Sequence, residues 1–180
     1  SFSHPEINSP QDITSGPDGR LWFTTENFPD RIMRMSTSGG QVGSFNDFAT
    51  VVDPLGITSG PDGNIWFTSG GQLARLSIPR CSGQIATVLL GPDGYGAPTG
   101  GNDVVVGTDG ANTINAGAGT DTVCGLAGND QLFGQGGNGD LLIGSTGADK
   151  LDGGPGSGDN CSGGPGTDTK VGCEISSGIP

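Results

Sequence analysis

A glycine-rich stretch in the second half of the chain decides the fold. Residues 107–152 read GTDGANTINAGAGTDTVCGLAGNDQLFGQGGNGDLLIGSTGADKLD. A glycine opens every unit except the one that begins at Ala116, and a polar residue, nearly always Asp, recurs every nine or ten residues. The same frame extends over residues 100–171. Its recurring polar positions are Asp103, Asn112, Asp121, Asp130, Asp140, Asp149, Asp159 and Asp168.

A second position recurs in phase with the first. Two residues after each polar position stand Val105, Ile114, Val123, Leu132, Leu142, Leu151, Cys161 and Lys170. This nine-residue period is typical of a parallel β-roll, in which such residues lie on short strands and point inward. One inward side chain per repeat is a very small core, too small to offset the ordering of so much glycine.

The polar positions predict a calcium site. Ca²⁺ takes six to eight oxygen ligands in flexible geometry, and a glycine-rich turn can direct its carbonyls inward while an Asp supplies charge. Two repeats make one turn of a roll, so carboxylates 18 to 19 residues apart should stack on one edge. We expect one edge to carry Asp103, Asp121, Asp140 and Asp159, and the other Asn112, Asp130, Asp149 and Asp168. Metal binding then supplies much of the folding free energy.

These residues resemble the RTX, or haemolysin-type, calcium-binding repeats over residues 100–171. The resemblance implies Ca²⁺ as the cofactor and the eight polar positions as its ligands. The pattern departs from the family's at Gly139 and Gly158, where a residue is inserted, and at Asn112, which brings no charge.

The first half carries a different repeat. Residues 10–24 read PQDITSGPDGRLWFT and residues 54–68 read PLGITSGPDGNIWFT, with 11 of 15 positions identical. Gly-Pro-Asp-Gly is a tight turn, and it lies between short runs rich in Ile, Trp, Phe and Thr, so each copy predicts a strand, a turn and a strand. Third runs lie at 31–35 and 72–76, and fourth runs at 41–46 and 84–90. Four strands in about 44 residues fits a propeller blade.

The string GPDGxxWFT, followed by a strand such as RIMRM, resembles the blade repeat of virginiamycin B lyase-like propellers over residues 8–90. Such lyases use a His and acidic residues with a metal. The single His here, His4, lies outside both motifs, so no catalytic residue carries over. Two blades cannot close a ring. Upstream blades, the second half of the chain or neighbouring copies must cover them.

Four cysteines bear on the compartment. Cys81, Cys124, Cys161 and Cys173 allow three connectivities, free buried thiols are the alternative, and no C-x₂-C pair suggests zinc. The stretch CSGGPGTDTKVGCE at 161–174 resembles the ending of secreted bacterial calcium-roll proteins. That resemblance implies Cys161–Cys173, with Cys81–Cys124 as the other pair. Disulfides predict an extracellular location.

Charge and composition exclude other classes. The formal net charge is −12, so a nucleic-acid partner is excluded, and no apolar run reaches the length of about 18 residues that crosses a bilayer. Residues 91–180 hold 26 of the 37 glycines. No G-x-S-x-G motif marks a nucleophile. Trp22 and Trp66 are expected in the blade core, Arg34 and Arg75 in structural hydrogen bonds, and Asp18 and Asp62 as turn caps.

The sequence therefore predicts an all-β chain. Residues 1–90 form two four-stranded propeller-type blades, 91–99 a linker, 100–173 a calcium-binding parallel β-roll, and 174–180 a tail. The predicted function is a secreted, non-enzymatic, calcium-binding structural or adhesive protein that self-associates into an oligomer or extracellular fibre. The alternative is the C-terminal fragment of a larger secreted propeller lyase or hydrolase whose active site lies elsewhere. The start at Ser1 without a leader suggests a processed product or a fragment.

Overall fold

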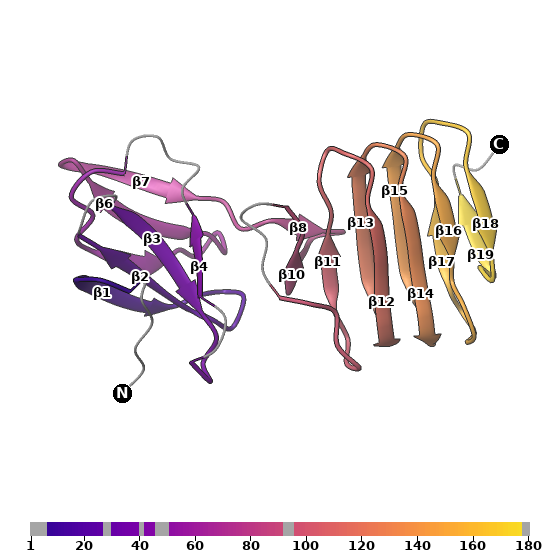
Figure 1. The fold of residues 1–180 in the computed structure, drawn as a ribbon, viewed down its shortest axis with the longest axis horizontal. Helices are drawn as coiled ribbons and strands as arrows, with labels where there is room; N and C mark the ends of the chain where they lie inside the picture. The colour runs from indigo at the N-terminus through magenta and orange to yellow at the C-terminus, as the bar shows by residue number, and fades with distance from the viewer. Residues whose placement is uncertain (1–6, 27–29, 40–41, 46–50, 92–95, 178–180) are drawn as a thin grey trace. The chain divides into compact units, whose positions relative to one another are not determined.

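The chain forms two compact units, Ser1–Ile78 and Pro79–Pro180, in a computed structural model (Figure 1). The structure describes residues 7–26, 30–39, 42–45, 51–91 and 96–177. Within these ranges every regular element is a β-strand, which confirms the all-β prediction, and no helix is present that could cross a membrane.

The first unit begins with a four-stranded antiparallel sheet in chain order. Its strands are β1 (Pro10–Ser15), β2 (Leu21–Thr25), β3 (Arg31–Met35) and β4 (Val42–Phe45). The second sheet has three antiparallel strands, β5 (Ile57–Ser59), β6 (Ile65–Ser69) and β7 (Gln72–Leu76). Both Gly-Pro-Asp-Gly segments close tight turns, with the Gly16 N–H donating to Arg20 O and the Gly60 N–H to Asn64 O. The strand, turn and strand predicted for each copy are thus confirmed.

Hydrogen bonds join these two sheets face to face. The Ser59 hydroxyl, on the side of β5 that also carries Ile57, donates to the Ser15 carbonyl. The Thr24 hydroxyl, on the Trp22 side of β2, donates to Leu55 O at 2.9 Å. Since side chains alternate along a strand, the Trp22 side of the first sheet meets the Ile57 side of the second.

The fourth strand predicted for the second copy, at 84–90, is wrong. This segment leaves the sheet and splits between β9 (Gln84–Ile85), which forms a hairpin with β8 (Arg80–Cys81), and β10 (Val88–Leu89). β10 pairs in parallel with β11 (Val104–Val106) in the second unit, where Val88 is buried in the core. The division between the units therefore falls after Ile78, not at the predicted residue 90.

The second unit is a parallel β-solenoid of two sheets. One sheet has the order β10-β11-β13-β15-β17-β19 and the other β12-β14-β16-β18. The remaining strands are β12 (Thr113–Gly119), β13 (Thr122–Ala127), β14 (Gln131–Gly137), β15 (Leu141–Thr146), β16 (Lys150–Asp152), β17 (Asn160–Ser162), β18 (Thr169–Val171) and β19 (Ile175–Ser177). In register, Val123 pairs with Val105 and Leu142, so two repeats make one turn, called a coil below.

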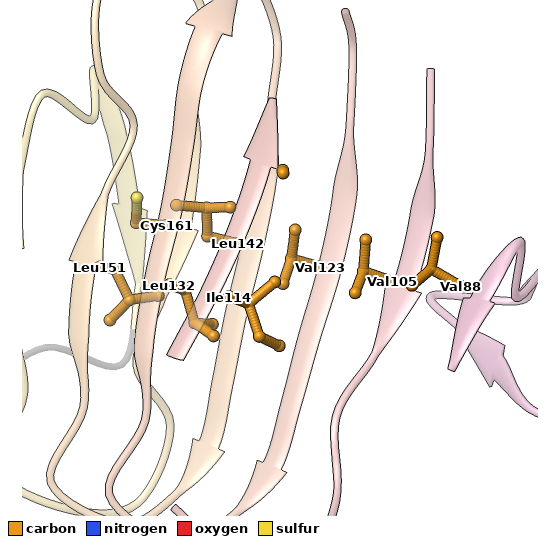
Figure 2. Packing of buried hydrophobic residues seen from close by; sticks show 9 residues of the cluster. Val88, Val105, Ile114, Val123, Leu132, Leu142, Leu151 and Cys161 are labelled. Atoms are coloured by element: carbon orange, nitrogen blue, oxygen red, sulfur yellow. The ribbon is translucent and has the colours of Figure 1, made fainter. Parts of the chain in front are cut away.

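A single file of apolar side chains forms the core between the two sheets (Figure 2). Its buried members are Val88, Val105, Ile114, Ala116, Val123, Leu132, Leu142, Leu151 and Cys161. Seven of the eight predicted inward positions are in this file. Lys170, the eighth, is exposed on β18, which is the last described strand of its sheet. Residues 175–177, predicted as tail, add the strand β19 to the first sheet.

Candidate metal centre

Two columns of carboxylates run along the solenoid, one on each edge. In the first ladder, the N–H groups of Asp103, Asp121 and Asp140 donate to Oδ1 of Asp121, Asp140 and Asp159, at 2.8, 2.9 and 3.0 Å. In the second, the N–H groups of Asn112, Asp130 and Asp149 donate to Oδ1 of Asp130, Asp149 and Asp168, at 2.8, 2.8 and 2.9 Å. The structure thus brings together both predicted stacks.

The main chain at these positions is also fully engaged. The carbonyl of each rung except the last, Asp168, accepts from the residue that follows the next rung, as in Leu141 N–H to Asp121 O and Lys150 N–H to Asp130 O, both at 2.8 Å. From Asp121 to Asp159, each rung aspartate therefore uses its N–H, its C=O and Oδ1 to hold neighbouring coils in register. Only Oδ2 is left for another partner.

Six rungs bury an Oδ2 atom that has no hydrogen-bond partner. They are Asp121, Asp130, Asp140, Asp149, Asp159 and Asp168, and none of these residues is more than 6% exposed. A buried carboxylate oxygen without a partner carries a large desolvation cost. A bound cation is a direct way to offset that cost.

The first rung of each ladder is different. Asp103 accepts from the Thr87 hydroxyl through Oδ1, and from the N–H and hydroxyl of Thr99 through Oδ2. Asn112 accepts from the Thr108 N–H at 2.8 Å and donates to the Thr108 hydroxyl. Side chains of threonine take up the polar atoms here, so these two predicted ligands lack the free oxygen that marks the other six.

Glycine carbonyls converge on the same places as the orphaned oxygens. A Cβ built on Gly134 would lie 2.5 Å from Asp140 Oδ2 and 2.6 Å from Gly153 O. A Cβ on Gly125 would likewise meet Asp130 Oδ2 and Gly144 O. Gly125 and Gly134 therefore each lie against the carboxylate oxygen of the rung that follows and one carbonyl of the next coil.

Burial raises the pKa of four rung carboxyls above the ordinary Asp value of 3.8. For Asp121, Asp130, Asp140 and Asp149 desolvation is the main cause; the backbone N–H bond opposes it, and the negative charge of a neighbouring rung adds to it. The ladders thus hold negative charges that repel one another in a site of low polarity. A divalent cation would relieve both penalties.

The donor set fits a hard cation only if the main chain takes part. Among the described residues, no three His, Cys, Asp or Glu side chains group closely enough to hold a metal ion by themselves. Carboxylate oxygens alternating with glycine carbonyls are ligands that Ca²⁺ accepts. The residues present therefore fit Ca²⁺, with Asp Oδ2 atoms and turn carbonyls as ligands.

One ladder residue was missed by sequence reasoning. Glu174 Oε2 accepts from the Asp159 N–H at 2.8 Å, so it occupies the fifth rung of the first ladder. It follows Asp159 by 15 residues rather than the 18 or 19 between earlier rungs. Because this spacing does not fit the nine-residue period, the sequence pattern did not predict Glu174 as a rung. Its place directly after Cys173 was the available signal.

Both disulfides implied by the resemblance are present. Cys81–Cys124 joins the β8–β9 hairpin to β13, and Cys161–Cys173 joins β17 to the segment before Glu174. The described structure contains no free cysteine. The first bridge lies in a small cluster with Ala86, Val104 and Val106 that covers the outer side of the first coil.

In the first unit, each repeat builds the same three-residue contact. Asp18 accepts from the Trp22 indole at 2.9 Å and pairs with Arg34 at 3.1 Å. In the second copy, Asp62 accepts from the Trp66 indole at 3.1 Å, and its carboxylate lies 3.6 Å from Arg75.

These contacts match the structural roles predicted for the Asp and Arg residues, and Trp22 is buried as predicted. The prediction of Trp66 in the core is wrong: it is only half-buried, because no described sheet covers its side of the second sheet. Hydrogen bonds from Asn64 and Trp66 lower the pKa of Asp62 to about 2. His4 lies outside the described residues.

A family model matches most of the solenoid. Residues 99–132 and 135–169 match the model described as RTX calcium-binding nonapeptide repeat (4 copies). Residues 99–169 thus carry RTX repeats. The RTX segment contains every rung of the two ladders except Glu174, and calcium is the ion for which the family model is described.

Two further comparisons concern the whole chain. Virginiamycin B lyase from Staphylococcus aureus is similar in structure, at 29% sequence identity and a TM-score of 0.34. The match covers 51% of this chain and 34% of the lyase, so the chain spans about a third of that protein. A search of curated proteins finds no match.

Proposed function

We propose that this chain is a secreted, non-enzymatic structural or adhesive protein whose RTX solenoid folds around Ca²⁺. The observation that carries the proposal is the set of six buried rungs whose Oδ2 atoms have no partner. These orphaned oxygens recur regularly along both edges, and those of Asp130, Asp140 and Asp159 lie beside the same glycine as a glycine carbonyl of the next coil. With the cation bound, the repelling columns become bridges between coils.

An extracellular location is consistent with Ca²⁺ as the bound ion. Two disulfides favour an oxidising, extracellular location, where Ca²⁺ is available at millimolar concentration. Mg²⁺ is a poorer candidate, since it demands near-ideal octahedral geometry and gives up water reluctantly.

Hydrogen exchange on the full chain, followed by mass spectrometry, tests the calcium proposal. With Ca²⁺, amides of β12 to β19 should be protected, and a chelator should remove that protection while β2 and β3 of the first unit stay unchanged. Asp140→Asn keeps the shape of the rung but removes its charge, so it should need more Ca²⁺ for the same protection. Asp109→Asn, at an exposed turn carboxylate, is the matched control. Equal exchange with Ca²⁺ and with chelator would refute the proposal.

We further propose that the two sheets of the first unit are propeller-type blades that pair with a second copy. The two repeats differ in how far their equivalent ion pairs are exposed. The side chains of Arg34 and Asp18 are 1% and 0% exposed, whereas those of Arg75 and Asp62 are 50% and 33% exposed. The first contact is covered by the second sheet. No described sheet covers the contact between Arg75 and Asp62. The outer side of the second sheet carries Trp66, Thr68, Leu73 and Arg75 and is called the Trp66 face.

The internal repeat indicates what fits the Trp66 face. The second sheet covers the first with Ile57, Ile65, Phe67 and Leu76, and the equivalent side of the first sheet carries Ile13, Leu21, Phe23 and Met35. These four residues, called the Phe23 face, line a groove of about 400 Å³. By the internal pattern, the Thr68 hydroxyl would donate to the partner copy's Gln11 carbonyl, as Thr24 does to Leu55.

Sedimentation of the purified chain tests this assembly. Head-to-tail pairing predicts species larger than a monomer that dissociate on dilution, and a monomer at every concentration would contradict it. Further blades of a longer chain are the alternative occupant of the Trp66 face, and the intact mass of the natural secreted protein separates the two.

A further inference from the structure

The segment that follows the last RTX repeat aligns with the repeats in space. β19 pairs in parallel with β17, with Ile175 opposite Asn160 and Ser176 opposite Cys161. Glu174 is therefore the register partner of Asp159. Its carboxylate accepts the Asp159 N–H, and the Asp159 carbonyl accepts the Ile175 N–H at 3.0 Å. These are the two bonds that every earlier rung makes.

The same segment also supplies a glycine carbonyl at the position where the repeats supply one. A Cβ on Gly153 would meet Gly172 O and would lie 3.0 Å from Asp159 Oδ2. Gly134 is flanked in the same way by Gly153 O and Asp140 Oδ2. Gly172 thus stands in the column of opening glycines, 19 residues after Gly153.

Asp159 provides an independent sign that something binds there. It is 0% exposed, and its Oδ2 has no partner. A fully buried carboxylate oxygen without a partner, beside the same glycine as the Gly172 carbonyl, would be strongly disfavoured without a cation.

We propose that residues 172–174 are a compressed final repeat and that Glu174 is the terminal calcium ligand of the first ladder, in a site shared with Asp159. This inference rests on the proposed calcium-dependent function and extends it beyond the matched repeats. In the full repeats, five residues separate the opening glycine from the rung at 153 and 159; here one residue, Cys173, separates Gly172 from Glu174.

Two features allow the shortening. The Cys161–Cys173 bridge fixes the residue between glycine and carboxylate to the buried central residue of β17. Glu has one methylene more than Asp, so its carboxylate can reach the rung position from a shorter turn. Glu174 is exposed, and no described coil lies beyond it, so this site is open on one side and should bind Ca²⁺ more weakly than the inner sites.

The test compares Glu174→Gln with Glu174→Ala in the full chain, using Ca²⁺ alone as the probe and calorimetry with native mass spectrometry as the readouts. Gln retains an oxygen that accepts the Asp159 N–H but removes the charge, whereas Ala removes both. The expected result is that both variants bind one Ca²⁺ fewer than wild type, or bind the weakest ion at least about tenfold less tightly. Asp109→Asn should bind like wild type.

Other outcomes separate the two proposals. If Glu174→Gln binds the same number of ions with the same affinities, while Glu174→Ala only unfolds at lower temperature, Glu174 is a structural cap and the inference is wrong. If wild type itself binds no Ca²⁺, the proposed function fails. Hydrogen exchange of β17 and β19 in Glu174→Gln checks that the end of the solenoid still folds.

Discussion

The opening glycine of each repeat is required by the oxygens that face it. At Gly134 a methyl group would fill the space between Asp140 Oδ2 and Gly153 O, both within 2.6 Å of it. At Gly136, two residues on, the nearest atom would be Gly117 O at 4.0 Å. Two glycines of the same strand, β14, therefore differ in the side chain that they can tolerate.

Gly134→Ala should accordingly destabilise the solenoid by about 3 kcal/mol and weaken Ca²⁺ binding, because both main chain and carboxylate must move. Gly136→Ala should change stability by less than about 1 kcal/mol. Thermal unfolding with and without Ca²⁺ measures both. Equal effects of the two substitutions would mean that the space beside Gly134 has no special role.

At the residue scale, the sequence predicted which residues form the two ladders, but it did not predict which groups their side chains bond to. The frame located every rung within the repeats because the Asp must follow its glycine turn at a fixed distance. It did not indicate that Thr99 and Thr108 would bond to the side chains of the first rungs, since a threonine before a rung differs little from any other turn residue.

At the scale of elements, the two ladders make the metal-free solenoid sensitive to pH. Burial raises the pKa of Asp121, Asp130, Asp140 and Asp149, so folding favours their protonated forms. A raised pKa contributes stability that is complete below the unfolded value, near 3.8, and is lost as pH rises through the folded value.

In chelator, the solenoid should therefore be more stable near pH 4 than at neutral pH. Protons compete with Ca²⁺ for the same oxygens, so the gain from adding Ca²⁺ should shrink as pH falls. Hydrogen exchange or thermal unfolding along a pH series measures both trends. A metal-free solenoid that gains stability steadily from pH 4 to pH 7 would contradict this account.

The strand at 84–90 shows where local pattern fails. Its spacing from the Trp66 strand suits a fourth blade strand, yet Val88 enters the solenoid core and its neighbour Thr87 bonds to Asp103. The choice depends on contacts between segments distant in sequence, which periodicity does not encode. The same limit explains β19, whose register is fixed by Glu174 and a disulfide rather than by a repeat.

The Cys81–Cys124 bridge attaches the segment that precedes and includes residues 84–90 to β13 of the solenoid. It closes a loop with a sequence separation of 43 residues, for which the chain-entropy model gives about 4 kcal/mol. Replacing both cysteines by Ser should lower the stability of the second unit by up to that amount and increase hydrogen exchange in β10 and β11 first. Cys161→Ser with Cys173→Ser should instead act on β17 and β19. Loss of protection spread evenly over the solenoid in both variants would argue against local stapling.

At the scale of the whole molecule, the first unit offers two different faces, so the proposed pairing would be head-to-tail. The Phe23 face of one copy would meet the Trp66 face of the next, which would leave one face of each kind free at the ends of any open assembly. Exposed apolar residues mark both faces: Ile13 is 57% exposed and Leu73 is 68% exposed. A charge at either position should block one face and leave the other intact.

This asymmetry gives a test by complementation. Ile13→Glu and Leu73→Glu should each be monomeric alone, whereas an equal mixture should form dimers and nothing larger, because each variant keeps the face that the other has lost. The double variant should join neither partner. Val171→Glu, at a residue 59% exposed in the second unit, should assemble like wild type. Sedimentation of the single variants and their mixture decides the matter: a mixture that stays monomeric, or single variants that assemble normally, would show that these two faces do not meet.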